Sequence, residues 1–503
     1  MNFFISKNWL FPLTPTRCIL IALISSSLLL GCSEKKEVDL SPILSTYLDD
    51  QSKTIEEFPI IIWISIDALR AKNLGCYGYY RNTSPQIDAF AKDAVLYTFA
   101  ISQSPYTSVS YASMFTGLNP NKHMAFRKLD ENYATIAEIL SRFGYETVAF
   151  TGGGYFSEEY GLNQGFKEYH KFPSDHTLKD IEWEITEAKK YLSNFKEKGG
   201  DEKLFLFIHT DQVHDPYTVP KEYKTTFLTE DTLLSITNPA LLDGNIRQYL
   251  GKNEERHYFN RYKTIPEKDK ELFITFYDEG IFVTDVWIGG FLDFLKENGL
   301  YENSLIILNA DHGQEFYEHG GWTHGTSVYG ELIQVPLIIK YPKSEKTGVE
   351  EDRIARNVDI FPTILHDILK LDISLLTFDG VSLSMKTSDV PMLSFVIKDN
   401  ECKKIAVIKG DYKYIRNYSK YSEDEPDRME EELFLFKKDI LDAHPLPLSS
   451  SDELELFRSI ADSERKIYKR NRIGFFKKRL DSEAEMKIKK ETENRLRDLG
   501  YIE

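Results

Sequence analysis

Ser304-Leu-Ile-Ile-Leu-Asn-Ala-Asp-His-Gly313 is a short apolar run that ends on an acid, an imidazole and a glycine. A run of roughly four to eight apolar residues bounded by turn residues is typical of a buried strand in a parallel sheet. In open α/β sheets the chemistry gathers beyond the carboxyl ends of the strands, where Asp311 and His312 would lie. An adjacent carboxylate and imidazole suit a divalent metal, although the same residues would also form an ordinary structural turn.

Other segments also have the pattern of buried strands. Pro59-Ile-Ile-Ile-Trp-Ile-Ser-Ile-Asp67 again ends on an acid, and residues 147–154, 204–209 and 335–342 are similarly apolar. A lone acid at a strand end can simply cap the next segment. Opposite Asp311, however, Asp67 becomes a candidate ligand of the same metal.

Strand-like and helix-like segments alternate up to about residue 390. Apolar residues recur at helical spacing after Pro85 and over residues 136–143 and 278–298. The alternation predicts an α/β domain over residues 57–390, with a mostly parallel sheet sandwiched by helices. Residues 218–275 show no clean period, and we expect an insertion that shapes the substrate entrance.

The character of the chain changes after residue 390. Short strand-like segments predict a small antiparallel subdomain over residues 391–450, and residues 451–503 predict a charged helical tail. Within the tail, Arg465 to Arg479 contains eight basic residues and no acid. This run favours a solvated helix face, and the alternative is a contact with anionic lipid headgroups.

Composition excludes some classes of function. The 503 residues carry a formal net charge of -17, which argues against general nucleic-acid binding. Outside the N-terminal segment only Cys76 and Cys402 remain, and two distant cysteines make neither a disulfide framework nor a cysteine-based metal site.

The first residues have the pattern of a targeting segment. Residues 1–31 contain Lys7, Arg17 and an apolar stretch but no acid, and Cys32 follows directly. The segment resembles a bacterial lipoprotein signal, which implies cleavage before Cys32 and lipidation of that cysteine. We therefore expect residues 32–56 to tether a domain outside the cytoplasm to a membrane of the bacterial envelope; the alternative is an uncleaved N-terminal anchor.

Hydroxyl and imidazole side chains cluster around the predicted strand ends. The segment from Ser104 to Gly117 is a hydroxyl-rich turn leading into a short helix. A hydroxyl at a helix N-terminus commonly caps the helix, but it can also be a nucleophile, since the N–H groups there stabilise an anionic group. His214 follows the 204–209 strand on the same expected rim as the two acids, which makes it a candidate site residue.

Taken together, these stretches resemble the alkaline phosphatase/sulfatase superfamily, specifically its sulfatase-like hydrolases and transferases, over roughly residues 57–445. Several ordered motifs carry the resemblance: Ile64-Ser-Ile-Asp67-Ala-Leu-Arg, Gly75-Cys-Tyr-Gly78, Thr83-Ser-Pro-Gln-Ile-Asp88, Ala112-Ser-Met-Phe-Thr-Gly117, Asp311-His-Gly and Glu318-His-Gly-Gly-Trp-Thr-His-Gly325. The segment from Glu432 to Ile440 resembles the family's C-terminal region, with Ile440 where proline is usual.

The resemblance implies a site as well as a fold. It implies a divalent metal (zinc, manganese or calcium) held by Asp67, Asp311 and His312, and it places the nucleophile at Thr107, which would itself coordinate the metal.

Five further residues match family positions around the substrate. His214 and His324 match catalytic positions that contact the transferred or leaving group. Arg70 and His319 match positions that contact the substrate or support the residues that do, and His123 matches a family histidine that we expect to bind substrate. Met124 replaces the glycine that usually follows the histidine at position 123.

The nucleophile segment departs from the formylglycine sulfatases. Those enzymes need Cys or Ser at the nucleophile, Pro or Ala two places on and Arg four places on, whereas here the run is Thr107-Ser-Val-Ser-Tyr111. A threonine instead resembles the phosphoglycerol and phosphoethanolamine transferases of the superfamily. We therefore predict a hydrolase or transferase that acts on phosphate-type esters, such as those of a lipid headgroup or a glycan, through a covalent Thr107 intermediate. The alternatives are a sulfate-ester hydrolase that works without formylglycine and a non-catalytic surface lipoprotein that retains the fold.

Overall fold

The computed structural model describes residues 60–126, 128–173, 181–197, 199, 203–251, 261–385, 390–398, 401–419 and 430–481. All of them belong to one compact unit, Val38–Glu503. The predicted signal peptide, Cys32 and the tether lie outside the described residues, so the lipid anchor stays a prediction. Among the helices described, none is long and apolar enough to cross a membrane.

A nine-stranded sheet forms the centre of the unit, with strand order β11-β2-β10-β6-β1-β5-β3-β4 and with β9 paired to β2. The strands are β1 (Ile61–Ile66), β2 (Val95–Ile101), β3 (Glu146–Thr151), β4 (Glu168–Lys171), β5 (Leu204–Thr210), β6 (Leu305–Ala310), β9 (Gln334–Val335), β10 (Leu337–Lys340) and β11 (Val349–Arg356). Only β9 and β10 run against the rest, so the predicted mostly parallel sheet is confirmed.

The three central strands bring their carboxyl ends together. β1 pairs in parallel with β5 on one side and with β6 on the other. Every residue of these three strands is buried, which explains their continuous apolar character. Asp67 and Asp311 directly follow β1 and β6, so the sheet places both acids on one rim.

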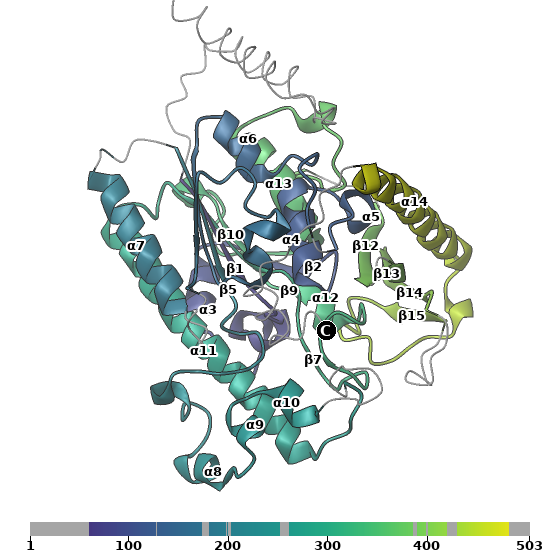
Figure 1. Cartoon of the computed structure of the whole chain (residues 1–503), viewed down its shortest axis with the longest axis horizontal. Coiled ribbons are helices and arrows are strands. Elements are labelled where there is room, and N and C mark those ends of the chain that lie inside the picture. Colours follow the sequence, from purple (N-terminus) through teal and green to yellow (C-terminus); the bar gives the residue numbers. More distant parts are fainter. Residues whose placement is uncertain are drawn as a thin grey trace, which may run out of the picture. The chain divides into compact units, whose positions relative to one another are not determined.

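Helices cover both faces of the sheet (Figure 1). One face carries α3 (Pro85–Lys92), α7 (Ile181–Glu197) and α11 (Glu267–Glu297), which pack on one another, and the other carries α4 (Thr107–Thr116), α6 (Ile136–Arg142) and α13 (Ile360–Thr363). Shorter helices are α5 (Pro120–His123), α8 (Glu230–Ser235), α9 (Pro239–Leu242), α10 (Ile246–Leu250) and α12 (Gly330–Ile333). The helix expected over 278–298 thus begins earlier, and the expected insertion contains α8, α9 and α10.

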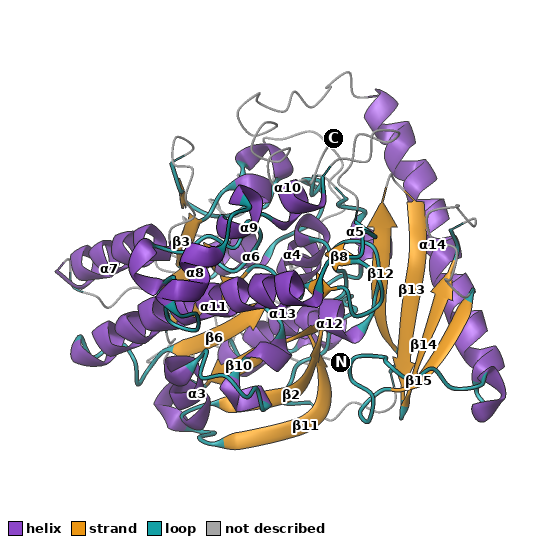
Figure 2. Ribbon diagram, turned by 90° about the horizontal axis from the view of Figure 1, so that it is seen from below, coloured by secondary structure: helices purple, strands orange, loops and turns teal. Residues whose placement is uncertain are grey.

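A second, antiparallel sheet lies in the C-terminal part (Figure 2). Its order is β12 (Met392–Lys398), β13 (Glu401–Lys409), β14 (Tyr412–Asn417) and β15 (Glu431–Leu435). The helix α14 (Leu454–Asp481) packs on it and buries Phe457 and Tyr468 against this sheet. The expected fold class, including the small antiparallel sheet and a helical tail, is therefore confirmed.

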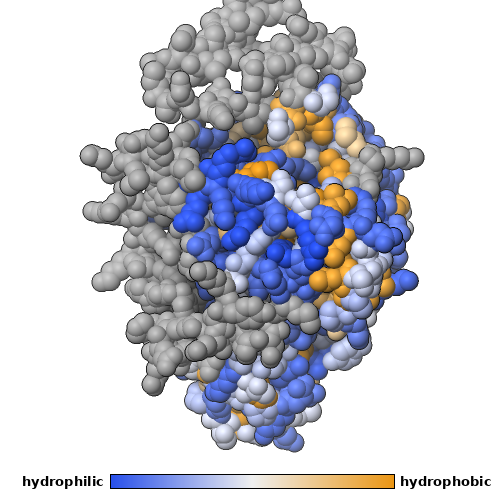
Figure 3. Space-filling view, turned by 90° about the vertical axis from the view of Figure 1, so that its right-hand side faces the viewer, coloured by the Kyte–Doolittle hydropathy of each residue, from blue (hydrophilic) through white to orange (hydrophobic). Residues whose placement is uncertain are grey.

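The basic run of the tail lies on α14. Lys466, Lys469 and Arg470 are exposed, while the guanidinium of Arg465 lies 4.0 Å from the ring centre of Tyr418. The face of the molecule that bears α14 shows mostly hydrophilic residues, with smaller hydrophobic patches (Figure 3). This surface fits the expected solvated helix face, and the contact with lipid headgroups stays a prediction.

Candidate active site

Two carboxylates and an imidazole meet at the carboxyl rim of the sheet. Asp67, Asp311 and His312 are all at most 3% exposed, and each offers a ligand atom within 4.8 Å of the others. Backbone amides hold one oxygen of Asp311, since its Oδ1 accepts hydrogen bonds from the N–H groups of Ala68 and His312. Ala68 adopts a left-handed conformation (φ 59°), which turns the chain sharply after β1.

The remaining atoms of this group face one another. Nδ1 of His312 lies 2.8 Å from the carbonyl oxygen of Gly313, which can only accept, so Nδ1 carries the hydrogen and Nε2 presents a lone pair. Nε2 lies 3.6 Å from Oδ1 of Asp67 and 3.4 Å from Oδ2 of Asp311. Both of these oxygens are buried without a hydrogen-bond partner.

The electrostatics of the site call for a cation. Burial and the charge of Asp67 raise the pKa of Asp311 well above its usual range. Burial acts in the same direction on Asp67, but the nearby imidazoles of His209, His214 and His312 lower the pKa of Asp67 overall. Two buried carboxylates facing each other are stable only with a proton or a cation between them. Two buried oxygens without partners and an imidazole lone pair fit a divalent metal. The backbone N–H of His312 orients the carboxylate of Asp311 for this role.

Thr107 lies beside the three ligands. It is the first residue of α4 and is 2% exposed. Its Oγ1 lies 3.2 Å from Nε2 of His312, so the predicted nucleophile and a predicted metal ligand are adjacent. The residue after β2, Ser102, accepts or donates a hydrogen bond with Ser110 of α4 (3.0 Å), and Ser110 donates to the carbonyl oxygen of Asp311. These two bonds fix α4 against the loop that carries Asp311 and His312.

His324 and His214 complete one side of the site. The ring of His324 lies 4.4 Å from that of His312 and 4.9 Å from that of His214, measured between centroids. Nδ1 of His214 donates to the carbonyl oxygen of Asp215 (2.6 Å). Gln314 uses its Nε2 to donate to the hydroxyl of Tyr217.

Gln314 therefore selects the tautomer of His324. Because Nε2 of Gln314 is the donor, its Oε1 must be the atom that accepts from Nδ1 of His324 (2.9 Å). The lone pair of His324 then lies on Nε2. Burial lowers the pKa of His324 well below its usual range, and the neighbouring imidazoles of His312 and His214 and the guanidinium groups of Arg247 and Arg261 act in the same direction.

His209 belongs to the site, although the sequence analysis did not single it out as a site residue. It lies on β5, beside Ser65 of β1, and is 1% exposed. The backbone N–H of Gly152 points at its Nδ1 (3.4 Å), so Nε2 carries the hydrogen, 3.8 Å from Oδ2 of Asp67. A polar residue near the end of an otherwise apolar central strand was the signal that could have identified it.

The three predicted substrate-binding residues are engaged within the protein. Arg70 pairs with Glu318 (2.5 Å), and His319 bonds to Glu331 and to the carbonyl oxygen of Asp442. The ring of His123 is fully buried; its Nδ1 accepts from the N–H of Ala125 and its Nε2 bonds to Ser113 of α4. His123 thus connects α4 to the segment after α5. For all three residues, contact with substrate stays a prediction.

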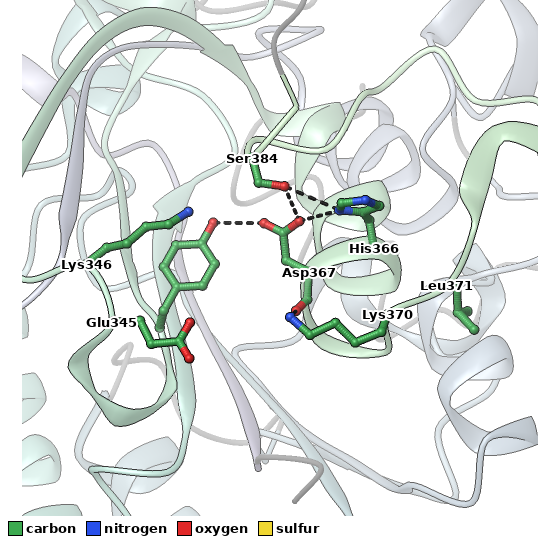
Figure 4. A pocket seen from close by; sticks show the side chains of 8 residues that line it. Glu345, Lys346, His366, Asp367, Lys370, Leu371 and Ser384 are labelled. Atoms are coloured by element: carbon green, nitrogen blue, oxygen red, sulfur yellow. Dashed lines mark hydrogen bonds and ion pairs between the residues drawn. The ribbon is translucent and has the colours of Figure 1, made fainter. Parts of the chain in front are cut away.

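A separate pocket of about 280 Å³ lies at the other end of the sheet. Lys340 pairs with Ile306, near the start of β6, so Tyr341 lies at the amino edge of the sheet. Ser384, His366 and Asp367 converge there (Figure 4). Ser384 Oγ and Asp367 Oδ1 contact the same nitrogen of His366, Nδ1, so the three do not form a relay from hydroxyl to imidazole to carboxylate.

Comparison with known proteins identifies the family. Residues 59–367 match the family described as "Sulfatase". The chain belongs to the sulfatase family. This result confirms the expected superfamily, and the fold agrees with it: the phosphonate monoester hydrolase of Agrobacterium radiobacter superimposes with a TM-score of 0.59 at 18% identity, covering 82% of this chain and 96% of that one.

Curated sulfatases are similar to the chain at low sequence identity. An ulvan-active sulfatase of Formosa agariphila is 26% identical over 379 residues, which is 69% of this chain and 66% of that protein. Iduronate 2-sulfatase of Mus musculus is 25% identical over 331 residues, which is 56% of this chain and 59% of that protein. The chain thus spans less than two thirds of the length of these sulfatases.

Proposed function

We propose that this sulfatase-family chain is a metal-dependent hydrolase or transferase of phosphate-type esters that works through a covalent intermediate on Thr107. One observation carries the proposal: Oγ1 of Thr107 lies 3.2 Å from Nε2 of His312, which in turn faces the orphaned oxygens of Asp67 and Asp311. The hydroxyl therefore lies at the ligand cluster instead of capping its helix, and α4 has no side-chain cap.

A divalent metal bound by Asp67, Asp311 and His312 would act as a Lewis acid, neutralising charge on the transferred group and favouring the alkoxide form of a nearby hydroxyl. The residues of the chain supply the remaining functions. Thr107 gives its hydroxyl proton to solvent and its Oγ1 attacks phosphorus, while the bond to the leaving oxygen breaks on the opposite side, which leaves a phosphothreonine. The backbone N–H groups at the start of α4 stabilise the phosphoryl oxygens.

The leaving oxygen needs a proton, and we assign its supply to His324, whose ring lies between those of His312 and His214. In the free site the pKa of His324 is held down, so its ring is neutral. An anionic ester bound beside the ring opposes the positive charges that lower this pKa, and the ring then takes up the proton that it passes to the leaving oxygen. Water or an alcohol next attacks the phosphothreonine with the same ring acting as base, and two displacements give net retention at phosphorus.

A second candidate is sulfate-ester hydrolysis, because the two curated relatives named above are sulfatases. We prefer phosphate-ester chemistry because a threonine hydroxyl cannot mature to formylglycine, whereas it can form a phosphate ester directly. The phosphonate monoester hydrolase among the structural relatives shows only that this fold also occurs in a phosphorus-ester enzyme.

A substrate panel tests the proposal. Wild type, Thr107→Ser and Thr107→Ala are assayed with 4-nitrophenyl phosphate, bis(4-nitrophenyl) phosphate and 4-nitrophenyl sulfate after loading with zinc, manganese or calcium. We expect the highest kcat/KM on a phosphate ester, a measurable rate for Thr107→Ser and a loss of about 10³-fold or more for Thr107→Ala. Faster turnover of the sulfate by wild type would favour the sulfatase candidate instead.

A further inference from the structure

A second group of side chains that could hold a metal lies on the segment after His312 and on α12. Glu315, His319 and Glu331 offer ligand atoms that all lie within 4.8 Å of one another. Glu315 and Glu331 are each 1% exposed. None of the three belongs to the Asp67–Asp311–His312 cluster.

Two oxygens of this buried group lack partners. One is Oε2 of Glu331, and the other is Oδ1 of Asp442, whose backbone carbonyl bonds to His319. Both residues are 1% exposed, so water does not replace the missing partners. The other oxygens are engaged: Oε1 of Glu331 lies 2.7 Å from Nδ1 of His319, and Oδ2 of Asp442 accepts from the N–H of Gly330 and pairs with Lys413. An unpartnered carboxylate oxygen in the interior costs free energy unless a cation or proton meets it.

The remaining contacts match those of a metal-bound histidine. Nε2 of His319 lies 2.8 Å from the carbonyl oxygen of Asp442, so this nitrogen carries a hydrogen and the ring is oriented from behind. Histidines that bind metals commonly donate their second ring N–H to such an acceptor. Oε1 of Glu315 is fixed by the N–H groups of Gly321 (2.8 Å) and His319 (3.2 Å), which orients the second carboxylate.

The charge balance also favours a divalent ion. With His319 protonated, the group formed by Glu315, Glu331, Asp442, Lys413 and His319 carries three negative and two positive charges. A divalent ion that replaces the proton on Nδ1 of His319 brings the same group to neutrality, because the imidazole then contributes no charge. Metal binding at this nitrogen releases that proton to solvent.

We propose that Glu315, His319 and Glu331 form a second, structural site for a divalent transition metal such as zinc, distinct from the catalytic one. Two carboxylates and one imidazole are a ligand set that zinc accepts. The backbone carbonyl of Glu331 accepts from the N–H of Gln314, and Asp442 lies 123 residues after His319. The ion would thus tie the loop that carries Gln314 to α12, and the hydrogen bond from His319 to Asp442 links this loop to the C-terminal part of the chain.

Metal counting separates this site from the catalytic one. Chelated protein is reloaded with zinc chloride alone and desalted, and bound zinc is measured by plasma mass spectrometry in wild type, Glu331→Gln, Asp311→Asn and the double variant. We expect about two, one, one and zero ions per chain. Glu432→Gln is the matched control and should keep both ions, because Glu432 accepts from Tyr329, whose ring stacks on His319, without belonging to the group.

Different outcomes overturn different claims. Retention of about two ions in Glu331→Gln, or a single ion in wild type that Glu331→Gln also retains, overturns the second site. Loss of an ion in Glu331→Gln but not in Asp311→Asn supports the second site and contradicts the catalytic one. If Glu331→Gln does not fold, anomalous diffraction at the zinc edge from wild-type crystals decides: a peak beside Nδ1 of His319 supports the site, and the absence of that peak overturns it.

Discussion

Oγ1 of Thr107 lies 3.2 Å from Nε2 of His312, although the two residues are 205 positions apart in the sequence. The contact depends on the sheet: His312 follows the end of β6, and Thr107 begins the helix reached from the end of β2. Both strands run in the same direction, so their carboxyl ends share one rim. The predicted nucleophile and the predicted metal ligands therefore lie close enough to act on one substrate atom.

Replacement of His324 should slow turnover in a way that depends on the leaving group. His324→Gln removes the proton donor while keeping a polar side chain in place. We expect kcat to fall by about 10²–10⁴-fold with a poor leaving group such as an alkyl alcohol, and far less with 4-nitrophenol, which leaves without protonation. An equal loss for both classes, measured by steady-state kinetics, would mean that His324 does not supply the proton.

Gln314→Glu should move the pH profile. The new carboxylate would face Nδ1 of His324 and raise its pKa, whereas burial and positive neighbours lower it in wild type. A general acid works only while protonated, so the basic limb of kcat should shift upward by about one pH unit or more. Gln314→Met, which cannot accept a hydrogen bond, should lower kcat without an upward shift. A basic limb that stays in place in Gln314→Glu would contradict this relation.

Asp311→Asn should have opposite effects on stability with and without metal. With metal, wild type should melt higher, because an ion at about 100 times its Kd stabilises the folded state by about 2.7 kcal/mol. Under a chelator the variant should melt at least as high as wild type, since it removes one of two facing buried carboxylates. Thermal unfolding in both conditions checks this. A chelated variant that melts well below chelated wild type would show that the two acids do not repel each other.

The chelated protein should lose stability as the pH rises. Burial lowers the pKa of His319, but its bond to Glu331 outweighs burial and raises the pKa to about 9. Since the unfolded value is near 6.5, the stabilisation is complete below about pH 6.5 and is lost as the pH rises through about 9. Urea unfolding at pH 6 and 9.5 should show this decline in wild type and a smaller one in Glu331→Gln. Equal declines would rule out the His319–Glu331 pair as the cause.

The continuous apolar runs in the sequence were enough to predict the central strands and the carboxyl edge of the sheet, where the two acids lie. β1 and β6 are buried on both faces, so their sequences are continuously apolar and the acids after them stand out. The reversed direction of β10 was not predictable, because a short buried strand has the same composition in either direction. β11 escaped detection for another reason: its residues are half exposed and charged.

Partners distant in the sequence limited what could be predicted about the site. Arg70 pairs with Glu318, 248 residues away, and His319 bonds to the backbone of Asp442, 123 residues away. No local pattern reveals such pairs, so the sequence could not show that these side chains also make contacts within the protein. His209 lies near Asp67 because its strand pairs with β1 in a register that sets His209 beside Ser65. This register is visible only in the folded sheet.

The most direct test of the central claim is the covalent intermediate. Metal-loaded protein is mixed with a phosphate ester turned over in the steady state, quenched in acid within milliseconds and analysed by intact-mass and peptide mass spectrometry. We predict an added phosphoryl group located on Thr107, which is absent from Thr107→Ala and from a quench without metal. Full turnover by Thr107→Ala, or an adduct located on another residue, would contradict the account.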